Sequence, residues 1–141
     1  MKIDVLSSED MNSTIQDEVV KLFKQLSPDK KQIELKDILT DKNPIIIAYC
    51  RDQDKIVGIA SLCIYKVISG YKGWIEDVVV DSNLRGKGIG RKLIEKLLEI
   101  GEAKKLSEIL LFTEDHRKPA INLYKNLGFI EKNSQIYNLK L

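Results

Sequence analysis

The stretch WIEDVVVDSNLRGKGIGR, residues 74–91, joins an apolar segment to a basic, glycine-rich turn and then to a second apolar segment. The first segment is rich in β-branched residues, which favour an extended backbone, and has Glu76 and Asp77 among them. The apolar residues of the second segment recur at spacings of three and four, the period of a helix. They are Ile89, Leu93, Ile94, Leu97 and Leu98. We therefore predict a strand over 74–80 and a helix that begins at the glycines.

The turn between these two elements is suited to bind a phosphate. The glycines at 86, 88 and 90 let an anion approach the backbone, and the first N–H groups of the helix carry the positive end of its dipole. Four cations lie in the same stretch, namely Arg85, Lys87, Arg91 and Lys92. The sequence matches neither the P-loop motif nor the dinucleotide-binding motif. The dinucleotide-binding motif would have a third glycine where Arg91 stands. We predict a site for a pyrophosphate.

Two motifs resemble the GNAT superfamily of acyl-CoA N-acyltransferases. Its cofactor motif is Gln or Arg, two residues, Gly, one residue, and Gly or Ala, located between a strand and a helix. Here it reads Arg85, Gly86, Lys87, Gly88, Ile89 and Gly90. The segment HRKPAINLYKNLGF, residues 116–129, resembles the last helix of the family, with Ala120, Tyr124, Gly128 and Phe129 at its characteristic places.

The resemblance implies an α/β fold of the GNAT type, with a mixed, mostly antiparallel sheet of six to seven strands and about four helices. It also implies a V-shaped splay between the fourth and fifth strands. The 141 residues are expected to form a single domain, 1–141. Predicted strands are Lys2–Leu6, Ile45–Arg51, Ile56–Val67, Trp74–Val80, Ile109–Thr113 and Gln135–Leu139. Predicted helices are Thr14–Leu26, Gln32–Leu39, one that runs from the glycines to about Gly101, and one around Tyr124.

The topology follows from the order of these elements. A helix between the strands 74–80 and 109–113 predicts that they are parallel, with a right-handed crossover. The earlier strands form an antiparallel meander. A hairpin near Asp52 would pair Cys50 with a residue near Val57, which leaves Cys50 and Cys63 apart, so we predict free thiols.

By the resemblance, the cosubstrate is acetyl-CoA, and its acetyl group passes directly to an amine in a ternary complex. Tyr124 stands where the family has a tyrosine that protonates the departing thiolate; the alternative is a tyrosine whose ring packs in the core. Glu76 is our candidate base, because residues 76, 78 and 80 of a regular strand share one face. Asp77, predicted on the opposite face, is the rival. Either acid could instead pair with a cation or bind the substrate ammonium.

The remaining cofactor contacts also follow from the resemblance. Backbone groups of the stretch Val78, Val79 and Val80 would bind the pantetheine arm, and an N–H near Val78 would stabilise the oxyanion. Arg117 replaces an asparagine common in the family and could meet a phosphate or an acidic substrate, with Asn122 as an alternative contact to CoA. The only histidine, His116, is expected at the surface.

Composition excludes several classes of function. The net charge is only +2 and the cations gather in one turn, so we expect no nucleic-acid partner. One histidine and two separated cysteines do not make a metal site. No apolar run is long enough for a membrane, and MKIDVLSSED does not resemble a signal peptide, so we expect a cytoplasmic protein. Small members of the family are often dimers, which leaves a homodimer open.

The substrate class is the least determined feature. A small amine is favoured, with an amino-sugar phosphate or an aminophosphonate as candidates, because IEDVVVDS and RGKGIG resemble the spelling of enzymes for such substrates. Residues 27–44 and the turn SGYKG, with Tyr71 and Trp74, are expected to shape the amine pocket. The alternatives are a protein or peptide N-acetyltransferase and a non-catalytic CoA-binding, sensing or interaction module.

Overall fold

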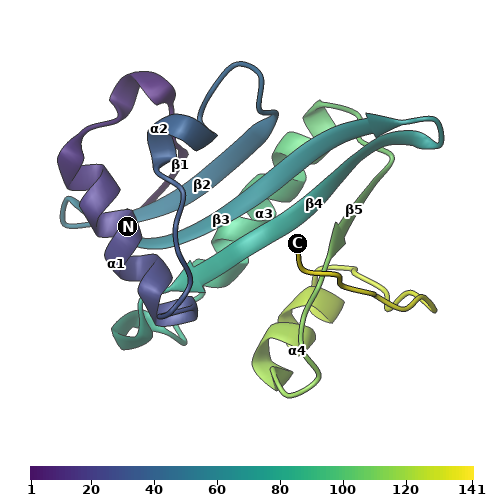
Figure 1. Cartoon of the computed structure of the whole chain (residues 1–141). Coiled ribbons are helices and arrows are strands. Elements are labelled where there is room, and N and C mark those ends of the chain that lie inside the picture. Colours follow the sequence, from purple (N-terminus) through teal and green to yellow (C-terminus); the bar gives the residue numbers. More distant parts are fainter.

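The computed structural model describes all 141 residues and has a five-stranded sheet at its centre (Figure 1). The strands follow one another across the sheet in chain order. They are β1 Lys2–Val5, β2 Ile45–Asp52, β3 Lys55–Val67, β4 Gly70–Val80 and β5 Glu108–Leu111. The first four are antiparallel, and β4 pairs in parallel with β5. The mixed sheet confirms the predicted topology.

Four helices surround the sheet, as predicted. They are α1 Ser13–Leu26, α2 Leu35–Ile38, α3 Ile89–Ala103 and α4 Lys118–Asn126. Single turns of 3₁₀ helix lie at Ser8–Asp10 and Ser82–Leu84. The side chain of Asn12 caps α1 by accepting a hydrogen bond from the Ile15 N–H at 2.9 Å. No helix is both long enough and apolar enough to span a bilayer.

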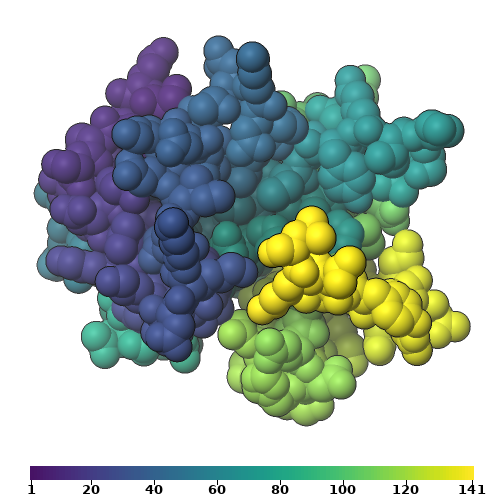
Figure 2. Space-filling view, in the orientation of Figure 1, coloured from purple at the N-terminus to yellow at the C-terminus, as the bar shows by residue number.

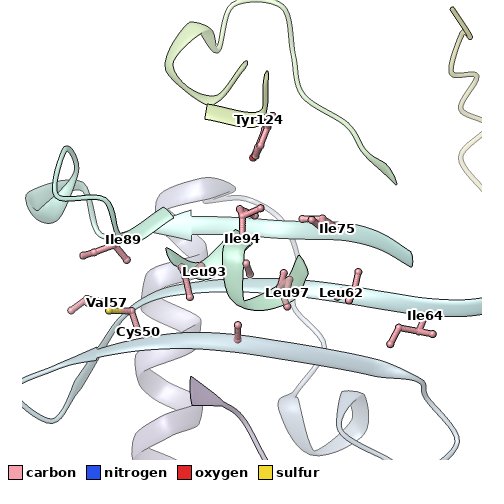
Figure 3. Close-up of a cluster of buried hydrophobic side chains, with 12 residues drawn as sticks. Cys50, Val57, Leu62, Ile64, Ile75, Ile89, Leu93, Ile94, Leu97 and Tyr124 are labelled. Atoms are coloured by element: carbon pink, nitrogen blue, oxygen red, sulfur yellow. The ribbon is translucent and has the colours of Figure 1, made fainter. Parts of the chain in front are cut away.

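Each face of the sheet has its own hydrophobic core. On one face, α1 and α2 cover a cluster that includes Val19, Leu22 and Leu35 together with Ile56 and Val79. On the other face, α3 packs its buried stripe against the sheet (Figure 3). This second cluster comprises Ala48, Cys50, Val57, Ala60, Leu62, Ile64, Ile75, Ile89, Leu93, Ile94, Leu97 and Tyr124. Since β3 is buried on both faces, it is the centre of the fold.

The prediction of six to seven strands was wrong, because Gln135–Leu139 does not form a strand. Residues 130–141 have neither helix nor strand, and Ile136 and Leu139 are 60% and 84% exposed. A short segment is stable as a strand only when it pairs with a neighbouring strand. The neighbour here would be β5, which has only four residues with which to pair. This C-terminal tail lies on the surface between α4 and the segment around residue 30 (Figure 2).

The predicted helix Gln32–Leu39 is also shorter than expected. Only Leu35–Ile38 is helical, and Ile33, assigned to the apolar face, is 70% exposed. Hydrogen bonds to α1, and not a longer helical ladder, hold this segment. The Gln16 carboxamide oxygen accepts from the Leu35 N–H at 2.9 Å, and Gln32 donates to the carbonyl of Val20 at 3.1 Å.

The hairpin between β2 and β3 turns at Gln53 and Asp54, both with positive φ. Cys50 pairs with Gly58, next to Val57 as predicted, and the register shifts after this pair. Both cysteines are free, as predicted, since Cys63 lies opposite Ile45 at the other end of the pair.

Candidate active site

A β-bulge in β4 determines how the acidic residues are presented. Ser61 of β3 pairs with Glu76 and Ile59 pairs with Val79, so Asp77 and Val78 together face one residue of β3. Asp77 takes a left-handed backbone, with φ of 52°. Aspartate is among the few residues that tolerate this conformation, and its presence within a β-branched run is the signal by which the bulge could have been predicted.

The bulge overturns our assignment of faces. In a regular strand residues 76, 78 and 80 would share a face, but Val78 and Val80 pack against the cluster under α3 while Val79 belongs to the cluster under α1. Glu76 therefore lies on the same face as Val79. Asp77, predicted on the opposite face, lies in the bulge and lines the same cavity as Glu76.

Strands β4 and β5 separate beside the bulge. Their parallel pairing ends at Ile75 and Leu111, yet β4 continues for five more residues, to Val80. Beyond Ile75 the edge of β4 that faces β5 has no partner strand, so its backbone polar groups are available to a ligand. This opening is the splay that the resemblance implied.

A cavity of about 130 Å³ occupies the opening. Its walls come from the end of α1, from β4, from the end of β5 and from α4. They are Leu26, Trp74, Ile75, Glu76, Asp77, Val78, Leu111, Phe112, Thr113, Arg117 and Tyr124. The structure thus brings together Tyr124, both acidic candidates and Val78, which the sequence predicted as one site.

Tyr124 extends from α4 toward β4 (Figure 3) and is 9% exposed. Burial raises the pKa of its hydroxyl, with Arg117 opposing that rise. A phenol with a raised pKa stays protonated at neutral pH, as a proton donor must be. The ring of Tyr124 also packs in the hydrophobic core, which was the alternative role considered above.

The two acids carry raised pKa values for related reasons. Burial raises the pKa of Glu76, and the charge of Asp77 adds to the rise. Burial likewise raises the pKa of Asp77. The Lys30 ammonium, in the loop after α1, lines a cavity with Asp77 and opposes both rises. A carboxylate with a raised pKa is a stronger base at neutral pH.

The glycine-rich turn lies where β4 leads into α3. Gly86 and Gly88 have φ of 80° and 79°, and a Cβ added at either position would meet nothing within 4 Å. Lys92 donates the first intrahelical hydrogen bond, to the carbonyl of Gly88. The N–H groups of residues 88–91 precede it and have no acceptor inside the helix. The unpaired N–H groups, which carry partial positive charge, and the open space beside the glycines together fit a phosphate.

The turn is held from three sides. The Asp81 N–H donates to the carbonyl of Val57 at 2.8 Å, and the Ser82 N–H donates to the Gln25 side chain at 2.9 Å. Arg91 donates to the Asn126 carboxamide oxygen at 2.6 Å and lies 3.6 Å from a Glu95 oxygen. Arg91 therefore joins α3 to α4, and Arg85, Lys87 and Lys92 are the cations free of such contacts.

The other predicted residues occupy different places. Arg117 precedes α4 and lines the cavity beside Tyr124, while Asn122 is exposed on α4. His116 is exposed and lies 3.3 Å from Glu114. Trp74 lines the cavity as expected, and its ring meets Phe112 edge to face at 4.3 Å. Tyr71 lies outside the cavity, beneath the Lys66 ammonium.

One polar atom of the cavity wall has no partner. The indole N–H of Trp74 is buried and has no acceptor in the protein. Leaving a buried donor unsatisfied costs about 1–3 kcal/mol. No three or more His, Cys, Asp or Glu side chains gather as a metal cluster would need.

The fold and this opening define an acyltransferase architecture, and comparison with known proteins agrees. Residues 12–129 match the model of the Acetyltransferase (GNAT) family. The chain belongs to this family. An acetyltransferase structure from Trypanosoma brucei superimposes with a TM-score of 0.81 at 29% identity, covering 99% of each chain.

Curated relatives match over shorter stretches. Thialysine N-epsilon-acetyltransferase of Mus musculus is 42% identical over 65 residues, which cover 46% of this chain and 38% of the relative. Glucosamine 6-phosphate N-acetyltransferase of Trypanosoma brucei brucei is 42% identical over 78 residues, covering 53% of this chain and 51% of the relative. The matches thus span about half or less of these relatives.

Proposed function

We propose that this protein transfers the acetyl group of acetyl-CoA to the primary amine of a small molecule. The observation that carries the proposal is the opening between β4 and β5, where Tyr124, Glu76 and Asp77 line one cavity. GNAT acetyltransferases use acetyl-CoA as cosubstrate. The relatives named for thialysine and glucosamine 6-phosphate support a small acceptor. We expect the reaction to take place in the cytoplasm.

The glycine-rich turn and the free edge of β4 would hold the cosubstrate. N–H groups at the start of α3 would bind the pyrophosphate, with Arg85 and Lys87 adding charge. Backbone groups of 78–80 would bind the pantetheine arm as a further strand does. The thioester would then lie between Val78 and Tyr124. Asn122, exposed on α4, is available to the outer part of the cofactor.

The chemistry needs a base, an oxyanion donor and an acid. Glu76, directly or through a water, would take the proton from the substrate ammonium, and the neutral amine would attack the thioester carbonyl. An N–H near Val78 would stabilise the oxyanion. Collapse of the intermediate breaks the C–S bond, and Tyr124 would protonate the departing thiolate. Asp77 is the alternative base.

The cysteines support direct transfer and not an acetyl-enzyme. Cys50 is buried in the core beneath α3. Burial raises the pKa of Cys63, and the charges of Glu76 and Asp77 raise it further. A thiol with a raised pKa has little thiolate, which is the nucleophilic form.

Isothermal titration with acetyl-CoA, followed by a thiol-release assay over a panel of amines, tests the proposal. We expect saturable binding of acetyl-CoA and release of CoA only when an amine acceptor is present. Absence of CoA binding would overturn the proposal. Binding with slow hydrolysis and no acceptor among amines or peptide N-termini would favour the CoA-sensing alternative.

A further inference from the structure

A second cavity, of about 460 Å³, adjoins the first through shared residues. Leu26, Asp77, Phe112, Thr113 and Arg117 line both. The loop after α1 adds Ser27 and Lys30 to its wall, and the tail adds Ile136. Its volume is in the range of sites for small ligands. The second cavity therefore continues the first one, where we propose the thioester lies, toward the loop after α1 and the tail.

Charged side chains of both signs line the two cavities. Lys30 and Arg117 are the cations, and Glu76, Asp77 and Glu114 are the anions. Glu114 lies 3.3 Å from His116, whereas the other four have no oppositely charged group within 4.0 Å. Side chains that face a shared space unpaired are available to a ligand, and a ligand that pairs both signs gains most.

We propose that the acceptor is an amine that also carries a carboxylate or phosphate, with its ammonium at Glu76 and Asp77 and its anion at Lys30 and Arg117. This inference rests on the proposed function and specifies its substrate class. Apolar side chains between the charged groups, Phe112 above all, would contact the carbon skeleton that joins the two ends. Arg117 then belongs to the acceptor side and not to the pyrophosphate.

The cations Lys30 and Arg117 make other classes of amine less favourable as acceptors. A diamine or polyamine would bring its second cation against Lys30 and Arg117, and like charges at close range are unfavourable. A neutral amine would leave both cations unpaired. An amine with a single anionic group satisfies both ends of the space, so discrimination should depend on that group more than on the size of the skeleton.

Matched pairs of amines test the inference by thiol-release kinetics at saturating acetyl-CoA. Lysine with cadaverine isolates the carboxylate, and glucosamine 6-phosphate with glucosamine isolates the phosphate. We expect the anionic member of at least one pair to have the higher kcat/KM, by about fivefold or more. The pair that shows the preference identifies which anion the site takes. Titration of each amine into the CoA-saturated protein gives a second readout, independent of turnover.

A charge reversal at Lys30 tests the residue itself. Lys30→Glu should raise the KM of the preferred anionic amine about fivefold, lower that of its non-anionic counterpart, and leave the Kd of acetyl-CoA unchanged. Lys31→Glu is the matched control, since this neighbouring exposed lysine lines neither cavity. A merely structural role for Lys30 would impair both amines together.

The outcomes separate the two proposals. If acetyl-CoA binds but the non-anionic amines react or bind as well as their anionic partners, the substrate class is wrong and the acetyltransferase activity stands. If Lys30→Glu affects both members of a pair equally, the assignment of Lys30 is wrong. Failure to bind acetyl-CoA would instead contradict the proposed function.

Discussion

The ring of Phe129 meets the ring of Tyr124 edge to face, with 5.9 Å between centroids and 67° between planes. The Phe129 N–H also donates to the backbone carbonyl of Tyr124 at 3.0 Å. These contacts use the ring and the main chain of Tyr124, so they hold its side chain in place without involving the hydroxyl. The position of the ring and the chemistry of the hydroxyl can therefore be separated by mutation.

Tyr124→Phe should lower kcat about 100-fold, the size of effect that a lost general acid produces. The Kd of acetyl-CoA should stay the same, because the ring contacts remain. Steady-state kinetics and isothermal titration measure the two quantities. Tyr65→Phe, a hydroxyl deletion in the β3–β4 hairpin at the register position opposite Lys72, is the control and should leave kcat unchanged. An unchanged kcat for Tyr124→Phe would remove this residue from the mechanism.

Glu76→Gln should abolish the acidic limb of the pH dependence of kcat/KM, because an amide cannot take a proton. Burial and Asp77 raise the pKa of Glu76, so in the wild type this limb should lie above the ordinary range of a glutamate. Asp77→Asn is the comparison. If its profile loses the limb and that of Glu76→Gln keeps it, Asp77 is the base.

Asp77→Asn should stabilise the fold at pH 8. The pKa of Asp77 is raised in the folded state, so folding favours its neutral form and the wild type loses stability as pH rises through that pKa. An amide has no such loss, and asparagine also tolerates the positive φ at this position. Urea unfolding should give a higher midpoint for the variant at pH 8. The two midpoints should converge below about pH 4, where aspartate is protonated in both states.

Gly88→Ala should weaken acetyl-CoA binding about fivefold to tenfold. The added Cβ meets no protein atom but projects where the phosphate would approach, and the left-handed φ costs about 1–2 kcal/mol in any L-residue other than glycine. Gly128→Ala is a matched control, since Gly128 also has positive φ and open space. Both variants should lose similar stability in urea, and only Gly88→Ala should change the Kd measured by titration.

Local patterns were enough to predict the elements that carry the proposed cofactor site. The strand through Val80, the glycine turn and α3 are specified by neighbouring residues, so the sequence alone places them. Pro119 in the first turn of α4 and Gly128 after its end follow the same logic, and both are confirmed.

The features that were missed depend on contacts between distant residues. The bulge at Asp77 arises from the register between β3 and β4, and it moves Glu76 to a different face from Val78. Lys30 was predicted only as part of the stretch 27–44, because the contact of the loop after α1 with β4 arises from the fold. The alternation over 135–139 predicts a strand, but it cannot say whether a partner edge is present.

Gly101 and Ile109 offer a test of how α3 fits against β5. A Cβ at Gly101 would lie 2.6 Å from Ile109 Cδ1, too close for atoms in contact. Overpacking of a core costs about 1–3 kcal/mol, which outweighs the gain of about 1 kcal/mol from replacing glycine by alanine within a helix. Gly101→Ala should therefore lower the free energy of unfolding.

Ile109→Val removes the clashing methyl group and by itself should cost about 0.5–1.5 kcal/mol. In the Ile109→Val background, Gly101→Ala should stabilise, because only the helix-propensity gain remains. A double-mutant cycle in urea measures this coupling. Gly90→Ala, whose Cβ would have only ordinary contacts at 3.8 Å or more, should have the same effect on stability in both backgrounds. Additive effects of Gly101→Ala and Ile109→Val would mean that the Ile109 side chain or β5 moves to admit the methyl group, and that the spacing between α3 and β5 is not fixed by this glycine.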